Sequence, residues 1–194
     1  MNPILRNLLL FGVQKTIPYT NLVTNGDFSD GTTGYDTLGF ATHSVTDSVL
    51  SIVANGATPL GLDSQITTTA IQANHIYYTR IKYKVTNADC LEMKIYNVGT
   101  TAGNTSVVLR TTPTINTVYD EGVIMYVGAS TGYFAVWFAH IYANEATANG
   151  KVMEVSQVMA IDLTAMFGAG NEPSLARCDT NMPFVATSGL CPAL

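Results

Sequence analysis

The sequence predicts an all-β protein, an antiparallel jelly-roll β-sandwich with a short N-terminal helix or arm and a short C-terminal helix and tail. The first observation is a series of nine short segments rich in strand-forming residues, with no helical pattern between them. The second is the turn chemistry that separates them, because Asn55-Gly56, Asn149-Gly150 and the stretch 99–104 are typical of turns. Many short strands at regular spacing predict two packed sheets. The candidate strands span 38–45, 49–54, 62–71, 76–86, 91–97, 106–111, 119–127, 133–142 and 152–163.

The segment 76–86 shows a clear alternation of residue types. One face would hold Tyr77, Thr79, Ile81, Tyr83 and Val85, and the other Ile76, Tyr78, Arg80, Lys82 and Lys84. The second face carries three of the nine basic residues of the chain. These side chains can meet an acidic neighbour or a glycan, although a basic stripe is more often a solvated face that blocks edge pairing.

Residues 1–18 differ from the rest and are expected to form an attachment arm or short helix outside the main domain. A segment this short is not a stable isolated helix in water. Exposed apolar clusters mark interaction sites, so we expect partner docking here. The alternative is an arm that folds back and covers a sheet edge of its own sandwich. The expected docking residues, at helix-like spacing, are Ile4, Leu5, Leu8, Leu9 and Phe11.

We expect the sandwich to span residues 19–170, and a C-terminal helix and tail to span 171–194. Asn171 is a candidate N-cap for that helix. Pro173 suits its first turn, because the N–H that a proline lacks would have no partner there. Prolines after residue 182 limit further regular structure, which predicts the tail.

Composition excludes several classes of partner. Hydrophobic residues make up 47% of the 194 residues, charged residues 12%, and the net charge is −5. This balance excludes a nucleic-acid partner, which needs a basic footprint, and no stretch reaches the ~20 apolar residues of a membrane span. A surface low in charge suits packing within an assembly, or simply reflects the threonine that strands favour.

The three cysteines are too few and odd in number for a disulfide framework. Cys178 and Cys191 could pair across the C-terminal segment. We prefer the interpretation that these two and Cys90 are reduced thiols of a protein assembled in the cytosol.

The sequence carries no enzyme signature, and we predict a non-enzymatic protein. It has no G-x-S-x-G, H-E-x-x-H or phosphate-binding glycine loop. Asp120 and Glu121 are adjacent, so a strand points them to opposite faces, whereas glycoside hydrolysis needs two acids facing one bond. The candidate glycan-stacking residues are Tyr96, Tyr126, Tyr133 and Trp137. Both faces of the strand around Trp137 are apolar, which favours a side chain in the core, or packed under a loop, over a sugar platform.

Three stretches, in order, carry a family resemblance. Residues 21–35 read NLVTNGDFSDGTTGY, residues 73–78 read ANHIYY, and residues 162–174 read DLTAMFGAGNEPS. Together they resemble the jelly-roll domains of bacteriophage and prophage tail, fibre and other virion proteins, which are similar to carbohydrate-binding modules. Two departures are Tyr35, where the family usually has Trp, and Ser29, where it usually has an acid.

The resemblance implies a non-enzymatic structural protein of a phage virion, either a capsid decoration or a component of a head or tail appendage. The alternative it leaves open is a host-glycan receptor-binding module of a tail fibre. The expected partners are other virion proteins and sister copies, for example in a trimer, and in the alternative a host surface glycan. The expected location is the virion, assembled in the host cytoplasm.

The resemblance also implies a structural calcium ion near the first and last strands, and no other cofactor. Asp27 and Asp162 match the two ends by motif position, while Ser29 removes one negative ligand. The competing interpretation, which we favour, is that Asp27 forms a turn and Asp162 caps the loop after the last strand.

Overall fold

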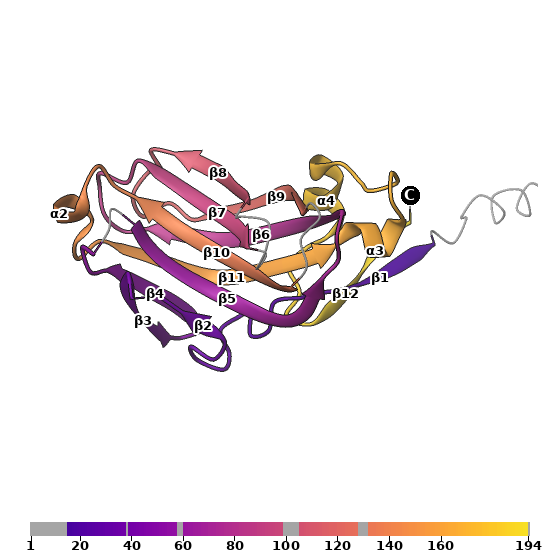
Figure 1. The fold of residues 1–194 in the computed structure, drawn as a ribbon, viewed down its shortest axis with the longest axis horizontal. Helices are drawn as coiled ribbons and strands as arrows, with labels where there is room; N and C mark the ends of the chain where they lie inside the picture. Colours follow the sequence, from indigo (N-terminus) through magenta and orange to yellow (C-terminus); the bar gives the residue numbers. More distant parts are fainter. Residues whose placement is uncertain (1–14, 38, 58–59, 99–104, 128–131, 194) are drawn as a thin grey trace, which may run out of the picture.

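Two five-stranded antiparallel sheets face each other in the computed structural model (Figure 1), which describes residues 15–37, 39–57, 60–98, 105–127 and 132–193. The first, the β10 sheet, has the order β2 (Tyr35–Asp36), β5 (Leu60–Ile71), β10 (Gly132–Ile141), β7 (Glu92–Val98) and β8 (Thr105–Thr111). The second, the β11 sheet, has the order β3 (Ala41–Thr46), β4 (Val49–Ala54), β11 (Val152–Asp162), β6 (His75–Val85) and β9 (Tyr119–Val127). The predicted sandwich and all nine predicted strands are therefore confirmed.

The main core lies between the sheets. The alternation of residue types along β6 places one set of its side chains in this core. Ile81 and Val85 are fully buried on its inner face, together with Tyr83. On its outer face Arg80 pairs with Asp120, and the Lys84 ammonium lies 2.7 Å from a carboxylate oxygen of a glutamate on β11. Arg80 and Lys84 therefore have the first of the roles considered for the basic residues, pairing with an acidic neighbour.

A second apolar cluster lies on the outer face of the β11 sheet, at one end. Two strands, β1 (Thr16–Thr20) and β12 (Ser188–Pro192), pair into an antiparallel ribbon that packs there with the helices α3 (Leu163–Phe167) and α4 (Leu175–Asn181) (Figure 1). The buried members of this cluster are Tyr19, Tyr78, Met159, Ile161, Leu163, Cys178, Met182 and Cys191. Both ends of the described chain thus cover the same sheet.

The ribbon corrects two expectations, the arm up to residue 18 and the tail after residue 182. Both contain a strand, because their prolines do not interrupt the ladder. The Ala193 N–H donates to the Lys15 carbonyl at 2.7 Å, and hydrogen-bonded pairs alternate along an antiparallel ladder. Pro18 and Pro192 fall at the positions between these pairs, so their missing N–H groups cost no bond. The predicted docking residues Ile4, Leu5, Leu8, Leu9 and Phe11 lie outside the described residues.

The helix boundaries also differ from the prediction. The α4 helix has Ser174 at its N-cap, and Asn171 instead donates its N–H to the Gly168 carbonyl in the preceding turn. The α3 helix, which the sequence did not predict, is capped by Asp162, whose side chain accepts the Ala165 N–H. A short helix α2 (Glu145–Ala148) and strand β2 were also not predicted.

The buried side chain of Asn21 connects three parts of the chain. Its Nδ2 donates to the carbonyls of Val158 and Val185, both at 3.1 Å. Its Oδ1 accepts the N–H groups of Val23 and Ala160, both at 3.0 Å. All four hydrogen-bonding positions of the amide are therefore used. The side chain ties the segment after β1 to β11 and to the segment that leads into β12.

Gly26 lies against the same part of β11. Its carbonyl accepts the Val158 N–H at 2.7 Å, and a side-chain carbon at residue 26 would lie 2.1 Å from the Val158 carbonyl oxygen. Only glycine permits this approach. The first of the three stretches that carry the family resemblance, residues 21–35, therefore contains Asn21 and Gly26 for structural reasons.

We expect Asn21→Ala to lower the free energy of unfolding by about 3 kcal/mol, because it leaves buried carbonyl and N–H groups without partners. Urea unfolding measures the change. The matched control is Asn55→Ala, which removes bonds to Gly39 and Ala57 in an exposed turn and should cost about 1 kcal/mol or less. Equal losses in the two variants would contradict the role given to Asn21.

Candidate functional site

The outer face of the β10 sheet carries the only tryptophan of the chain. Val136 and Phe138 on β10 are fully buried between the sheets. Because side chains alternate along a strand, Trp137 between them points to the outer face, where it is partly exposed. Of the two expected positions, the core is therefore wrong, and packing under a loop stays a prediction. The strand is central, as expected, but its outer face stays open at Trp137.

Trp137 has an aromatic neighbour on β7. Met93 and Ile95 point into the core, so Tyr96 points outward, and it stands directly opposite Trp137 in the register of β7 and β10. Residues opposite each other have Cβ atoms about 5 Å apart on the same face. Tyr96 is in turn opposite Ser106 of β8, so a row of Trp, Tyr and Ser crosses three strands.

Polar groups flank this aromatic pair. Lys94, two residues before Tyr96, lies on the same face, and its ammonium is 2.7 Å from a carboxylate oxygen of Glu92. The hydrogen bond that the Lys94 ammonium donates to Glu92 raises the pKa of Lys94, so the lysine stays charged. Tyr96 and Trp137 were candidates from the sequence. Lys94, Glu92 and Ser106 were not, because only the strand register places these three beside the aromatic pair.

This face is free of the elements that cover the other sheet. The ribbon of β1 and β12 belongs to the cluster on the β11 sheet, as do residues of α3 and α4, and Figure 1 shows β5, β10 and β7 side by side. None of the described helices is long and apolar enough to cross a bilayer. The structure thus presents an aromatic pair with flanking polar groups on an open sheet face.

The other two predicted stacking residues do not join this pair. Tyr126 lies on β9 of the opposite sheet, where its side chain is 55% exposed and its hydroxyl donates to Asn74 at 2.8 Å. Tyr133 lies on β10, four residues before Trp137, but its side chain lies outside the described part of the structure.

The adjacent carboxylates point to opposite faces, as predicted, and both are engaged by cations. Asp120 accepts from the Arg80 guanidinium at 2.6 Å. Glu121 accepts from Arg110 and, at 2.7 Å, from the Tyr83 hydroxyl. These contacts tie each acid into a structural ion pair on the β9 side of the sandwich.

The two predicted calcium ligands each have local partners. Asp27 accepts from the N–H and the hydroxyl of Ser29, at 3.3 and 2.9 Å. Asp162 caps α3 and lies 2.8 Å from the Nδ1 of His75. The turn and cap roles are thus present. Within the described residues no three His, Cys, Asp or Glu side chains gather as a metal site would require. These contacts do not fit an open set of calcium ligands, and the calcium site stays a prediction.

The second and third stretches of the family resemblance, residues 73–78 and 162–174, are joined by hydrogen bonds. The Ile76 N–H donates to the Thr164 hydroxyl at 2.9 Å, and that hydroxyl donates to Glu172 at 2.6 Å. Glu172 also accepts the Gly170 N–H at 2.8 Å. The hydrogen bond between Thr164 and Glu172 lowers the pKa of this carboxyl. Ile76, Thr164, Gly170 and Glu172 therefore have structural roles, away from the open face of the β10 sheet.

The buried nucleophiles and bases are held in neutral forms. All three cysteines are free and buried, and burial raises the pKa of Cys90 to about 11 and of Cys178 to about 12. His140 lies between the sheets with its Nδ1 3.0 Å from the Tyr142 hydroxyl, and burial lowers its pKa to about 3. A buried thiol and a neutral imidazole of this kind are inert packing groups.

Comparisons with known proteins support the fold. No family model matches the chain, and neither does any curated protein. The CBM22-1–CBM22-2 tandem domain of Paenibacillus barcinonensis Xyn10C is similar, with a TM-score of 0.57 and 10% identity over 74% of this chain and 50% of that one. The arabinose-bound α-L-arabinofuranosidase MgGH51 has a TM-score of 0.58 and 12% identity over 87% of this chain and 30% of that one.

A structure described as CBM4 is also similar, with a TM-score of 0.50 and 9% identity over 72% of this chain and 99% of that one. The chain spans half or less of the first two proteins. At these identities the likeness shows the fold alone, a β-sandwich like that of carbohydrate-binding modules.

The buried His140 predicts a pH dependence of stability. Its pKa is lower in the folded state, at about 3, than the ~6.5 of an unfolded chain, so the folded state binds fewer protons between these values. Stability should therefore fall as the pH drops below ~6.5, by up to about 1.4 kcal/mol per pH unit from this group. Urea unfolding from pH 7 to pH 4 should show a shallower fall for His140→Phe. Identical slopes would contradict the burial of a neutral imidazole.

Calcium is expected to contribute little to stability, because Asp27 and Asp162 already have protein partners. A ligand that binds only the folded state raises the melting temperature by mass action. Adding a chelator should therefore leave the melting temperature unchanged. A fall on chelation that is reversed by added calcium, and lost in Asp27→Asn, would establish the site.

Proposed function

We propose that the protein is a non-enzymatic glycan-binding module whose binding face is the outer face of the β10 sheet. The observation that carries this proposal is the aromatic pair of Trp137 and Tyr96, side by side in the strand register on an open face. A flat indole beside a phenol offers an apolar surface for the C–H face of a sugar ring, while each keeps a polar tip for water or a hydroxyl.

The flanking side chains supply the polar part of such a site. Binding sites for small molecules combine apolar surface with a few placed polar groups that fix orientation. Lys94 can donate to sugar hydroxyls and Glu92 can accept from them, and Ser106 can do either. Since Lys94 and Glu92 neutralise each other, the face suits an uncharged saccharide.

The comparisons agree with a binding role, because several similar structures are described as carbohydrate-binding modules. The absence of catalysis is supported by the acids that the structure describes. Glu92 is held by Lys94, while Asp120 and Glu121 are held by arginines on the other side of the sandwich. Two acids facing one glycosidic bond would be needed for hydrolysis.

For the biological setting we propose a bacteriophage virion, on the three ordered sequence signatures. Within the virion, the partly exposed aromatic pair favours a module that binds host surface glycan, as in a tail fibre. A purely structural capsid decoration or head or tail appendage is the second candidate, and the low charge of the chain favours it. Incorporation into particles without glycan binding would select this second candidate.

The fluorescence of Trp137 tests the binding role, because it is the only tryptophan. Titration with a panel of host-surface oligosaccharides should give a saturable shift for at least one of them. Trp137→Ala, followed by calorimetry, should weaken binding of that saccharide at least 10-fold, about 1.4 kcal/mol, because the stacking surface is lost. The matched control, Tyr126→Ala, removes an exposed aromatic ring from the opposite sheet and should bind normally.

Melting curves of both variants show whether the fold is intact. Equal binding by both variants would place the site elsewhere. The same incubations should release no reducing sugar, and release that depends on a single carboxylate would overturn the non-enzymatic assignment.

A further inference from the structure

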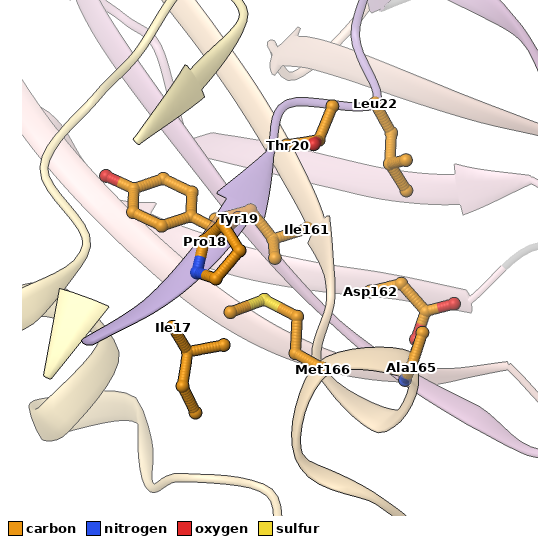
Figure 2. Close-up of a pocket in the computed structure, with 9 residues that line it drawn as sticks. All are labelled: Ile17, Pro18, Tyr19, Thr20, Leu22, Ile161, Asp162, Ala165 and Met166. Atoms are coloured by element: carbon orange, nitrogen blue, oxygen red, sulfur yellow. The ribbon is translucent and has the colours of Figure 1, made fainter. Parts of the chain in front are cut away.

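An apolar groove of about 360 Å³ lies beside the ribbon (Figure 2). The ribbon packs on the β11 sheet, whereas the aromatic pair is on the β10 sheet. Its lining comes from β1, Leu22, the end of β11 and α3, and includes no residue of β12. Asp162 is its one charged lining residue, and this carboxylate already holds His75 and the α3 N-terminus. Figure 2 shows Ile17, Pro18 and Met166 around the groove.

The groove lies next to a strand edge that is poorly suited to strand addition. Among the described strands β1 pairs only with β12, and the ladder alternation directs the backbone groups of Pro18 away from β12. Pro18 has no N–H to offer there, and a proline on an edge blocks pairing with an added strand. The groove is therefore suited to apolar side chains rather than to an extended peptide backbone.

The ribbon beside the groove carries no charge. Neither Thr16–Thr20 nor Ser188–Pro192 contains an ionisable acid or base other than Tyr19 and Cys191, which are buried. On the outer side of the ribbon Leu190 is 65% exposed, opposite Pro18 in the register. The groove has Asp162 as its one charge, and the ribbon beside it adds none, which indicates an apolar partner of low charge.

The chain itself contains a segment of this chemistry, residues 1–14, which precedes β1 directly. This segment has one charged side chain, Arg6, and contains the five expected docking residues, Ile4, Leu5, Leu8, Leu9 and Phe11. The ladder of β1 and β12 extends to Lys15, whose carbonyl accepts the Ala193 N–H. The segment therefore meets β1 at its N-terminal end, whereas Leu22 follows its C-terminal end. To reach the groove of its own molecule, the segment would have to reverse direction at once.

We propose that the groove binds the apolar segment, residues 4–11, of a second copy of this chain. If helical, fourteen residues extend about 21 Å, which is long enough to reach a neighbouring molecule. Each copy would give its segment and receive another, so the ribbon becomes an interface between sister copies. This interface is independent of glycan binding on the β10 sheet.

Cysteine crosslinking tests the exchange with the full chain. One variant carries Leu8→Cys and a second carries Ala165→Cys, an exposed residue that lines the groove. When the two variants are mixed and oxidised with copper phenanthroline, we expect a disulfide-linked dimer. The control replaces the second variant with Ala176→Cys, an exposed alanine on α4 outside the groove, and should crosslink at least 10-fold less. The native thiols are buried and should not compete.

Three outcomes would overturn the proposal. The first is equal crosslinking by Ala165→Cys and Ala176→Cys, which indicates random collision. The second is a chain carrying both Leu8→Cys and Ala165→Cys that forms only an internal disulfide, which indicates docking within one molecule. The third is a mass of 20.7 kDa for the unmodified protein by light scattering at all concentrations tested. We expect a multiple of this mass, reduced to the monomer by Leu8→Asp.

Discussion

The amide of Asn21 is the interaction on which the arrangement of the chain ends depends. Its four hydrogen bonds hold β11, the segment after β1 and the segment before β12 together. The Asn21 N–H adds a bond to the Thr187 carbonyl at 2.8 Å. Because these groups are buried, each bond replaces water that cannot reach them, and losing the set would leave several polar groups unpaired. The ribbon, α3 and α4 are fixed on the β11 sheet from this point.

This arrangement makes the two faces of the sandwich unequal. The β11 sheet is covered at one end by the second apolar cluster, in which Tyr78 of β6 is fully buried under the chain ends. Its hydroxyl donates to Asp179 of α4 at 2.8 Å, which fastens the helix to the sheet. The β10 sheet keeps Trp137 and Tyr96 partly exposed. The proposed glycan face on one sheet and the proposed docking face on the other can therefore act without competing.

The sequence predicted the strands well, because their signals are local. Alternation in 76–86 gave the inner face of β6, and the segments 49–54 and 119–127 have the bounds of β4 and β9. Pro18 and Pro192 were misleading, since their effect depends on the ladder position that pairing with a distant strand assigns. Local sequence contains no information on that pairing.

The site was only half predictable for the same reason. Trp137 and Tyr96 were both candidates, but their position opposite each other follows from the register of β7 and β10. Apolar residues on both sides of Trp137 suggested burial, whereas the covering elements pack on the other sheet. The signatures drew attention to Asp27 and Asp162, whose contacts are structural. Residues that identify the fold and residues proposed to bind glycan are separate sets in this chain.

Hydrogen–deuterium exchange with and without a saturating oligosaccharide tests the central claim. This claim is that the outer face of the β10 sheet binds the saccharide and that the ribbon, α3 and α4 do not. The account predicts slower exchange in peptides from β7 and β10, with no change in peptides from α3, α4 and the ribbon. Protection confined to α3 and the ribbon, with β7 and β10 unchanged, would contradict it.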